Sequence, residues 1–192
     1  MDVFDIKKNV YIAYKSDTSR YLAYIFYLAL CKKKLEVFYD KVRIEVSDAW
    51  KETLNNSLHK SNVCLIIGEK GAFDSLIIKE GYGADEFLNE VSCAIEMRNE
   101  KLSEIMYLAV EGYKPWEDDR LNSAQTVRNL QQYQALSFHF KDKSERLIKE
   151  EIKEVVSKCE KLCEKGFLKS IRTQSNFEGQ MIKRSIPTTK NI

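Results

Sequence analysis

A glutamate in the second turn of a predicted helix is the residue best placed to do chemistry in this chain. The helix is expected between Asp85 and Glu96, where apolar residues recur on one face at Phe87, Leu88, Val91, Ala94 and Ile95. At about 100° per residue, Glu90 falls at the edge of this apolar face. A carboxylate there suits acid–base or electrostatic catalysis. The same position is also common for an ordinary surface glutamate, so spacing alone leaves both interpretations open.

The elements around this helix predict where the glutamate lies in the fold. Apolar runs typical of buried strands occupy residues 9–15, 35–40, 63–67, 105–110 and 135–138, and helical patterns follow each of them. This order is typical of a flavodoxin-like three-layer α/β fold, with a five-stranded parallel sheet, helices on both faces and an extra C-terminal helix. Ligands of such folds bind at the carboxyl ends of the strands, and the Glu90 helix begins at that edge.

Length and composition indicate a single domain with a short extension. The chain has 192 residues, of which 44% are hydrophobic and 31% are charged, as in soluble globular proteins. We expect the domain over residues 1–170, with Gly166 ending the last helix, and a flexible polar tail over residues 171–192. The net charge of +2 arises from 31 basic and 29 acidic residues that are mixed along the chain, which argues against a nucleic-acid partner.

The remaining bulk features predict a cytoplasmic protein without a membrane segment or a metal site. The most apolar stretch, Tyr21–Cys31, is too short to span a bilayer, and the N-terminus lacks the apolar run of a signal peptide. The five cysteines have no disulfide-framework spacing, which indicates reduced thiols. Cys159 and Cys163 are one helical turn apart, but no further Cys or His lies nearby to complete a metal site.

Two common uses of this fold do not fit the residues. A dinucleotide-binding Rossmann domain needs a glycine-rich turn after the first strand, and Lys15–Arg20 contains no glycine. A phospho-acceptor domain would end its third strand with an acidic residue, whereas this strand ends Ile67-Gly68-Glu69. Both interpretations are therefore disfavoured.

Five motifs in unbroken order resemble those of TIR (Toll/interleukin-receptor) domains, over about residues 9–110. They are the first strand Val10–Asp17, the second strand Val37–Asp40, the helix segment Ala49–Ser61, the third strand Val63–Ile67 and the segment Asp85–Ala94. In the last of these, Phe87 replaces the family's usual tryptophan and Glu90 matches its glutamate. The BB loop, Lys41–Ser47, lacks the usual glycine.

Many members of this family cleave NAD, so the resemblance implies that Glu90 is the catalytic residue and that NAD is a substrate, with no cofactor or metal. It also implies a substrate-binding set of Tyr14, Lys15, Ser16, Asp17, Asp40, Trp50 and Phe87. Lys15 and the start of the following helix would meet the pyrophosphate, and Trp50 would offer an aromatic face. Breaking the nicotinamide–ribose bond builds positive charge on the ribose, which a carboxylate stabilises.

The resemblance is to the bacterial stand-alone type of the family, as in Thoeris antiphage defence. There, the product would be ADP-ribose or a cyclic ADP-ribose isomer that signals to a downstream effector protein, and the enzyme would form a homo-oligomer through its BB loop. The alternative is a non-catalytic adaptor that acts through self-association alone. The sequence leaves hydrolysis, cyclisation and the adaptor role open.

Overall fold

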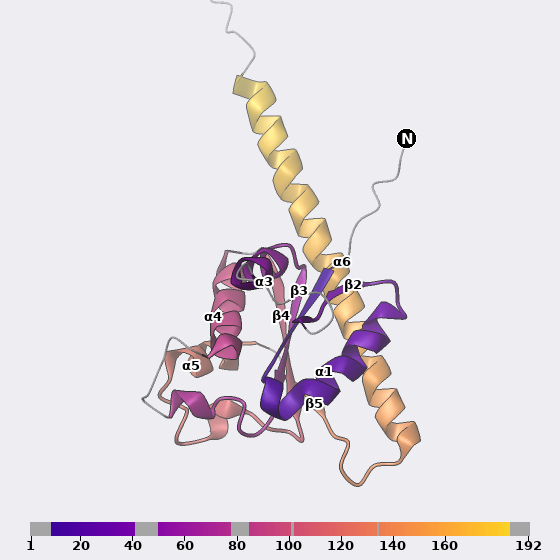
Figure 1. Cartoon of the computed structure of the whole chain (residues 1–192). Helices are drawn as coiled ribbons and strands as arrows, with labels where there is room; N and C mark the ends of the chain where they lie inside the picture. The colour runs from indigo at the N-terminus through magenta and orange to yellow at the C-terminus, as the bar shows by residue number, and fades with distance from the viewer. Residues whose placement is uncertain (1–8, 41–49, 78–84, 101, 134, 185–192) are drawn as a thin grey trace, which may run out of the picture.

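A parallel five-stranded sheet forms the centre of the molecule (Figure 1). The computed structural model describes residues 9–40, 50–77, 85–100, 102–133 and 135–184. The strands are β1 (Asn9–Tyr14), β2 (Glu36–Phe38), β3 (Val63–Gly68), β4 (Glu104–Val110) and β5 (Ala135–Phe138), in the order β2-β1-β3-β4-β5. All four pairings are parallel. The predicted flavodoxin-like α/β fold is therefore confirmed.

Helices cover both faces of the sheet, which gives the three layers. On one face lie α1 (Ser16–Cys31) and α6 (Glu145–Arg184), and on the other lie α3 (Trp50–His59), α4 (Glu86–Asn99) and α5 (Gln125–Gln131) (Figure 1). Two short 3-10 helices, η1 (Asp74–Leu76) and η2 (Pro115–Glu117), follow β3 and β4. Right-handed crossovers place α1 on one face, where the chain moves outward from β1 to β2, and α3, α4 and α5 on the other face, where it moves back across the sheet.

The inner strands β3 and β4 are buried along their whole length because helices cover both of their faces. Every residue of β3 and of β4 is buried, as the continuous apolar runs in the sequence predict. At the end of β3, Gly68 leaves room for the fully buried ring of Tyr107 on β4. A Cβ atom at Gly68 would lie 1.8 Å from the Tyr107 hydroxyl oxygen. The glycine is therefore required by close packing between two neighbouring strands.

Two predicted boundaries differ from the structure. The second strand was expected over residues 35–40 but is limited to Glu36–Phe38, and Asp40 already has helical geometry. The last helix was expected to end at Gly166, which is wrong, because α6 continues to Arg184. A glycine inside a helix costs only about 1 kcal/mol relative to alanine and does not stop it, and the next proline is Pro187.

Other predictions fall partly outside the described residues. The BB loop, Lys41–Ser47, belongs to the undescribed segment 41–49. The division into a domain over residues 1–170 and a tail from residue 171 stays a prediction, and its boundary falls inside α6. Among the described helices, none combines the length and the apolar character that crossing a bilayer requires.

Candidate active site

A pocket of about 180 Å³ lies at the carboxyl edge of the sheet, between the end of β1 and the start of α4. Seven of the eight predicted site residues line it: Tyr14, Lys15, Ser16, Asp17, Asp40, Phe87 and Glu90. They come from three separate segments, which the parallel sheet brings together because the carboxyl ends of its strands share one edge. Their assignment to catalysis and substrate binding stays a prediction.

The end of β1 supplies the aromatic wall of the pocket through Tyr14. Its hydroxyl donates a 2.5 Å hydrogen bond to Oδ1 of Asp40, and its ring stacks on Tyr39 with 5.4 Å between the ring centroids. Burial raises the pKa of Tyr14 well above its ordinary value, and the hydrogen bond to Asp40 adds to this effect. Tyr14 therefore remains a protonated donor and holds the Asp40 carboxylate at the pocket.

An ion pair connects Lys15 to the start of the Glu90 helix. Nζ of Lys15 lies 2.6 Å from Oδ2 of Asp85 and 3.3 Å from the Ser75 hydroxyl, which also donates to Asp85. Asp85 is the N-cap residue of α4, because its Oδ1 accepts a 3.3 Å hydrogen bond from the N–H of Leu88. Lys15, expected to meet a pyrophosphate, is thus already neutralised by a carboxylate.

The start of α1 borders the pocket on the same side as Lys15. Lys15 is the N-cap residue, and its side chain makes no capping hydrogen bond. The Ser16 hydroxyl accepts a 2.9 Å hydrogen bond from Arg20, and Asp17 is exposed in the first turn. The N–H groups of Thr18 and Ser19 already donate to the Lys15 carbonyl oxygen, which leaves those of Ser16 and Asp17 for a ligand. The Asp17 carboxylate offsets their positive potential.

Glu90 occupies the second turn of α4 and faces the pocket while most of its surface is covered by the protein. Burial raises the pKa of Glu90 to about 8. A hydrogen bond from Tyr11 lowers this pKa in part, whereas repulsion from the carboxylates of Asp40, Glu86 and Asp85 raises it further. At neutral pH in the free protein, Glu90 is therefore mostly a neutral carboxylic acid.

The pocket as a whole is acidic. Five carboxyl side chains and one lysine line it: Asp17, Asp40, Asp85, Glu86 and Glu90 with Lys15. Such a lining attracts a cationic group and stabilises positive charge that develops on a bound sugar. In the described part of the chain, no group of three or more His, Cys, Asp or Glu side chains is arranged to hold a metal ion.

The last two predicted residues have different surroundings. Phe87 is 3% exposed and packs edge-on against Phe73, with 5.2 Å between the ring centroids, so it forms the floor of the pocket and belongs to the core. Trp50 begins α3, but its side chain lies outside the described part of the structure.

Three residues near Glu90 were not predicted as part of the site. Asp85 and Glu86 line the pocket, and Tyr11 interacts with Glu90 from within the core. In the sequence, Asp85 is an acidic residue at the start of the predicted helix, which indicates a helix start and does not by itself indicate a binding site. The sequence did not indicate a role for Tyr11 in the site, because a tyrosine in the apolar run of β1 is expected to be an ordinary buried strand residue.

The fold and the site together define a class, an α/β protein with the TIR-type flavodoxin-like fold and an acidic pocket at its carboxyl edge. No protein-family model matches the sequence, and no curated protein matches it. The fold assignment therefore comes from solved structures.

Among these, the TIR domains of the activated Roq1 resistosome, which directly recognises the pathogen effector XopQ, superpose with a TM-score of 0.53. Their sequence identity is 11%, over 79% of this chain and 99% of that chain. The heterodimer of the RPS4 and RRS1 TIR domains gives a TM-score of 0.49 at 15% identity, over 81% and 97%. The CMP N-glycosidase BcmB of Clostridium botulinum gives 0.47 at 15% identity, over 77% and 97%. At 11% identity, the likeness to the Roq1 TIR domains shows the fold alone.

Proposed function

We propose that this protein cleaves the N-glycosidic bond between nicotinamide and ribose in NAD, with Glu90 as the catalytic residue. The observation that carries the proposal is the position of Glu90. It is a partly buried carboxyl group with a raised pKa, and it lies among the other acids of the pocket at the carboxyl edge of the sheet. Perturbed carboxyl groups in pockets are typical of catalytic sites. The resemblance of the segment 85–94 to that of NAD-cleaving TIR domains supports the same residue.

The charge of the pocket favours one end of NAD over the rest. The nicotinamide ring carries a positive charge, and the ribose gains positive charge as the bond to nicotinamide breaks. The acids around Glu90 stabilise both, whereas the anionic pyrophosphate is repelled. A volume of about 180 Å³ also holds only part of a dinucleotide. NAD would therefore enter nicotinamide-ribose end first, with its pyrophosphate outside, near the N–H groups of Ser16 and Asp17 at the start of α1.

The state of the Glu90 proton follows from the same charges. A cationic ring beside Glu90 favours the ionised carboxylate, so substrate binding would release the proton that the free protein holds. Nicotinamide leaves as a neutral molecule and needs no proton from a general acid. The carboxylate is then free to hold the ribose hydroxyls and to stabilise the positive charge on the sugar.

This mechanism predicts the direction of the pH dependence. Values of kcat/KM report ionisation in the free enzyme, where the pKa of Glu90 is about 8. Because the ionised form is the active one, kcat/KM is expected to rise with pH and to level off above about pH 8. A reaction in which Glu90 acts as a general acid would instead lose activity over the same range, so the sign of the slope tests the role.

The deciding experiment is incubation of purified, concentrated protein with NAD, followed by chromatography and mass spectrometry. Glu90→Gln is expected to abolish nicotinamide release. Glu96→Gln, an exposed residue farther along the same helix, is the matched control and is expected to retain activity. The mass of the second product distinguishes ADP-ribose from a cyclic ADP-ribose, which contains one water less. Equal release by both variants would show that Glu90 is not catalytic.

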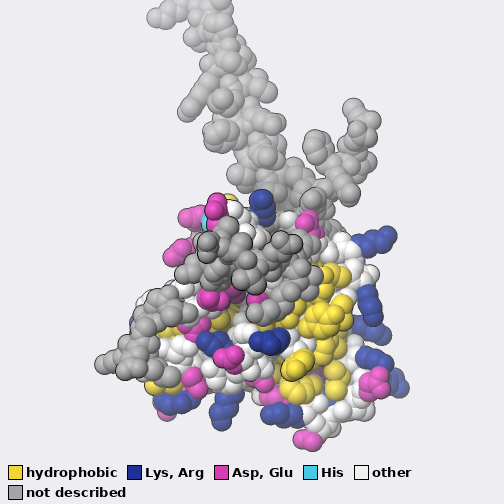
Figure 2. Space-filling view, in the orientation of Figure 1, with side chains coloured by type: hydrophobic (Ala, Val, Ile, Leu, Met, Phe, Trp, Pro, Cys, Tyr) yellow, Lys and Arg dark blue, Asp and Glu magenta, His cyan; other side chains and the backbone are white. Residues whose placement is uncertain are grey.

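A second candidate, the adaptor that acts through self-association, is supported by one surface feature. Hydrophobic side chains gather over α1 (Figure 2), where Tyr21, Tyr24, Ile25 and Leu28 are exposed. A contiguous apolar patch of this kind is typical of a protein–protein interface. No NAD cleavage at high protein concentration, together with dimers that Tyr21→Ser dissociates in sedimentation experiments, would favour the adaptor. The downstream signalling role in antiphage defence depends on a cyclic product being found.

A further inference from the structure

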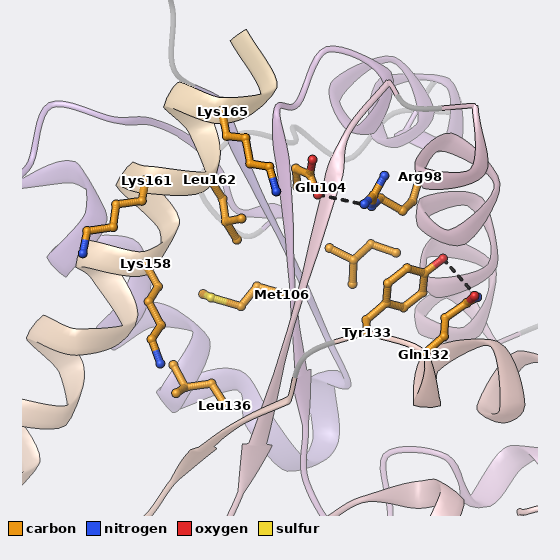
Figure 3. Close-up of a pocket in the computed structure, with 11 residues that line it drawn as sticks. Arg98, Glu104, Met106, Gln132, Tyr133, Leu136, Lys158, Lys161, Leu162 and Lys165 are labelled. Carbon is orange, nitrogen blue, oxygen red and sulfur yellow. Dashed lines mark hydrogen bonds and ion pairs between the residues drawn. The ribbon is translucent and has the colours of Figure 1, made fainter. Parts of the chain in front are cut away.

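A second and larger pocket, of about 340 Å³, lies at the opposite edge of the sheet from Glu90. It is located at the amino end of β4, because β4 begins at Glu104 while its pairing with β5 begins only at Tyr107. Residues 104–106 thus extend past the end of the edge strand and leave a gap beside them. The α6 helix forms one wall, and the ends of α4 and α5 form the other (Figure 3).

The charge of this amino-edge pocket is the reverse of that around Glu90. Of its five charged lining residues, four are basic: Arg98, Lys158, Lys161 and Lys165, with Glu104 as the acid. Lys165 directs its amine toward the sheet, beside Glu104, whereas Lys161 points outward (Figure 3). Nζ of Lys158 lies 2.9 Å from Oε1 of Glu154, one turn earlier on α6, so its charge is already paired. The amine of Lys165 therefore gives this wall a positive potential that attracts an anion.

Arg98 provides a second, more rigid cationic group on the opposite wall. Its Nε lies 3.2 Å from Oε2 of Glu104, whose side chain is only 8% exposed (Figure 3). This contact uses one edge of the guanidinium and holds it in place, and its further N–H groups remain as donors in a fixed plane. A phosphate matches such a planar donor set better than a single ammonium does.

The interior of the pocket is apolar and has one aromatic face. Met106 and Leu136 come from the sheet, Leu162 comes from α6, and the Tyr133 ring forms the far side (Figure 3). The Tyr133 hydroxyl accepts a 3.3 Å hydrogen bond from Gln132, which fixes the ring orientation. A flat ring inserted here would cover apolar surface and stack on Tyr133. The volume is in the range of small-molecule sites.

From these features we infer that the amino-edge pocket binds a phosphate-bearing molecule with a planar ring, of the size of a purine mononucleotide. The ring lies on Met106, Leu136 and Tyr133, and the phosphate lies between Arg98 and the amine of Lys165. This site is independent of the reaction proposed for Glu90, because the two pockets lie at opposite ends of parallel strands. Its ligand is an anion, which the acidic pocket repels.

The test follows the methyl group of Met106 by NMR, on full-length protein labelled at its methionine methyl groups and titrated with AMP. The Met106 signal is assigned with Met106→Leu. We expect AMP to shift this signal. Adenosine lacks the phosphate and inorganic phosphate lacks the ring, so each should need at least about tenfold higher concentration to cause the same shift. Glu90→Gln is expected to leave the shift unchanged. No shift at millimolar AMP, or an equal affinity for inorganic phosphate, would overturn the inference.

Two variants on the same helix make the test specific. Lys165→Ala should weaken AMP binding at least about tenfold, since a charge-assisted contact is lost. Lys153→Ala removes one charge on the exposed part of α6 and should change the affinity less than about twofold. Lys165→Arg keeps the charge and should retain binding, which excludes a folding defect. Equal losses in the first two variants would contradict the site.

Discussion

Lys15 and Asp85 connect the starts of two helices at one wall of the acidic pocket, with 2.6 Å between Nζ and Oδ2. Lys15 precedes α1, and Asp85 caps α4, whose second turn carries Glu90. The Asp85 side chain is 8% exposed and that of Lys15 is 24% exposed, so water screens this ion pair only in part. The ion pair therefore fixes the position of α4, and with it that of Glu90, relative to the end of β1.

The first prediction separates the two roles of Asp85. Asp85→Asn keeps an acceptor for the Leu88 N–H but loses the charge, whereas Asp85→Ala loses both. We expect Asp85→Ala to lower the free energy of unfolding by about 1 kcal/mol more than Asp85→Asn, which is the usual worth of an N-cap. Urea denaturation at pH 7 measures both variants. Equal stabilities would show that the cap contributes nothing.

The same ion pair predicts a loss of stability in acid. Burial raises the pKa of Asp85, but hydrogen bonds from Lys15, Ser75 and Leu88 outweigh this and leave its pKa below the ordinary value. The stabilisation is therefore complete above the unfolded-state pKa of about 4 and is lost as the pH falls through the folded-state pKa. Asp85→Asn should lack this part of the acid dependence, which urea denaturation between pH 7 and pH 3 would reveal.

The second prediction concerns Glu90, whose ionisation should lower the stability as the pH rises, in contrast to Asp85. Its pKa is about 8 in the folded protein and about 4.3 in an unfolded chain, so the folded state binds the extra proton between these values. Stability should fall by more than about 1 kcal/mol from pH 5 to pH 8, and the permanently neutral Glu90→Gln should not show this fall. Glu96→Gln is the matched control. A parallel pH dependence of wild type and Glu90→Gln would contradict the raised pKa.

The third prediction tests the coupling between Asp40 and Glu90. Repulsion from the Asp40 carboxylate is one cause of the raised Glu90 pKa. Asp40→Asn is therefore expected to lower the pKa of Glu90, and the carboxyl carbon signal of Glu90 in an NMR titration would measure it directly. Asp119→Asn, an exposed aspartate, serves as the control and should leave the Glu90 titration unchanged. This measurement does not depend on catalytic activity.

The fourth prediction concerns the close packing of β3 on β4. Gly68→Ala would place a methyl group 1.8 Å from the Tyr107 hydroxyl oxygen, which also donates a 3.2 Å hydrogen bond to the Tyr113 carbonyl. We expect a loss of about 1–3 kcal/mol in the free energy of unfolding, the usual cost of overpacking a core. Urea denaturation at pH 7 would measure this loss. An unchanged midpoint would show that the strands separate easily at this point.

Part of the fold followed from the sequence because its signals are local. The apolar runs of β1, β3 and β4 are continuous, since both faces of these strands are covered, and five alternating elements leave few arrangements other than a parallel sheet. The end of α6 was not predictable from Gly166. A helix tolerates one glycine, and the residues that follow it decide where the helix ends.

The candidate site was predictable as far as one edge of the sheet. Topology alone directs the ends of β1 and β2 and the start of α4 to the same edge, which is why seven of the named residues meet in one pocket. The amino-edge pocket had no such signal. It depends on how far β4 extends past β5 and on which α6 lysines turn inward, and neither follows from periodicity.

The sequence by itself determined the order of the elements and the position of Glu90 at the edge of a helix face, because both depend on spacing along the chain. Only the tertiary structure decided the chemistry of that residue. The pKa of Glu90 depends first on burial and then on Tyr11, Asp40 and Asp85. Except for Asp85, these groups are far from Glu90 in the sequence, and packing alone brings them close enough for desolvation and Coulomb forces to act.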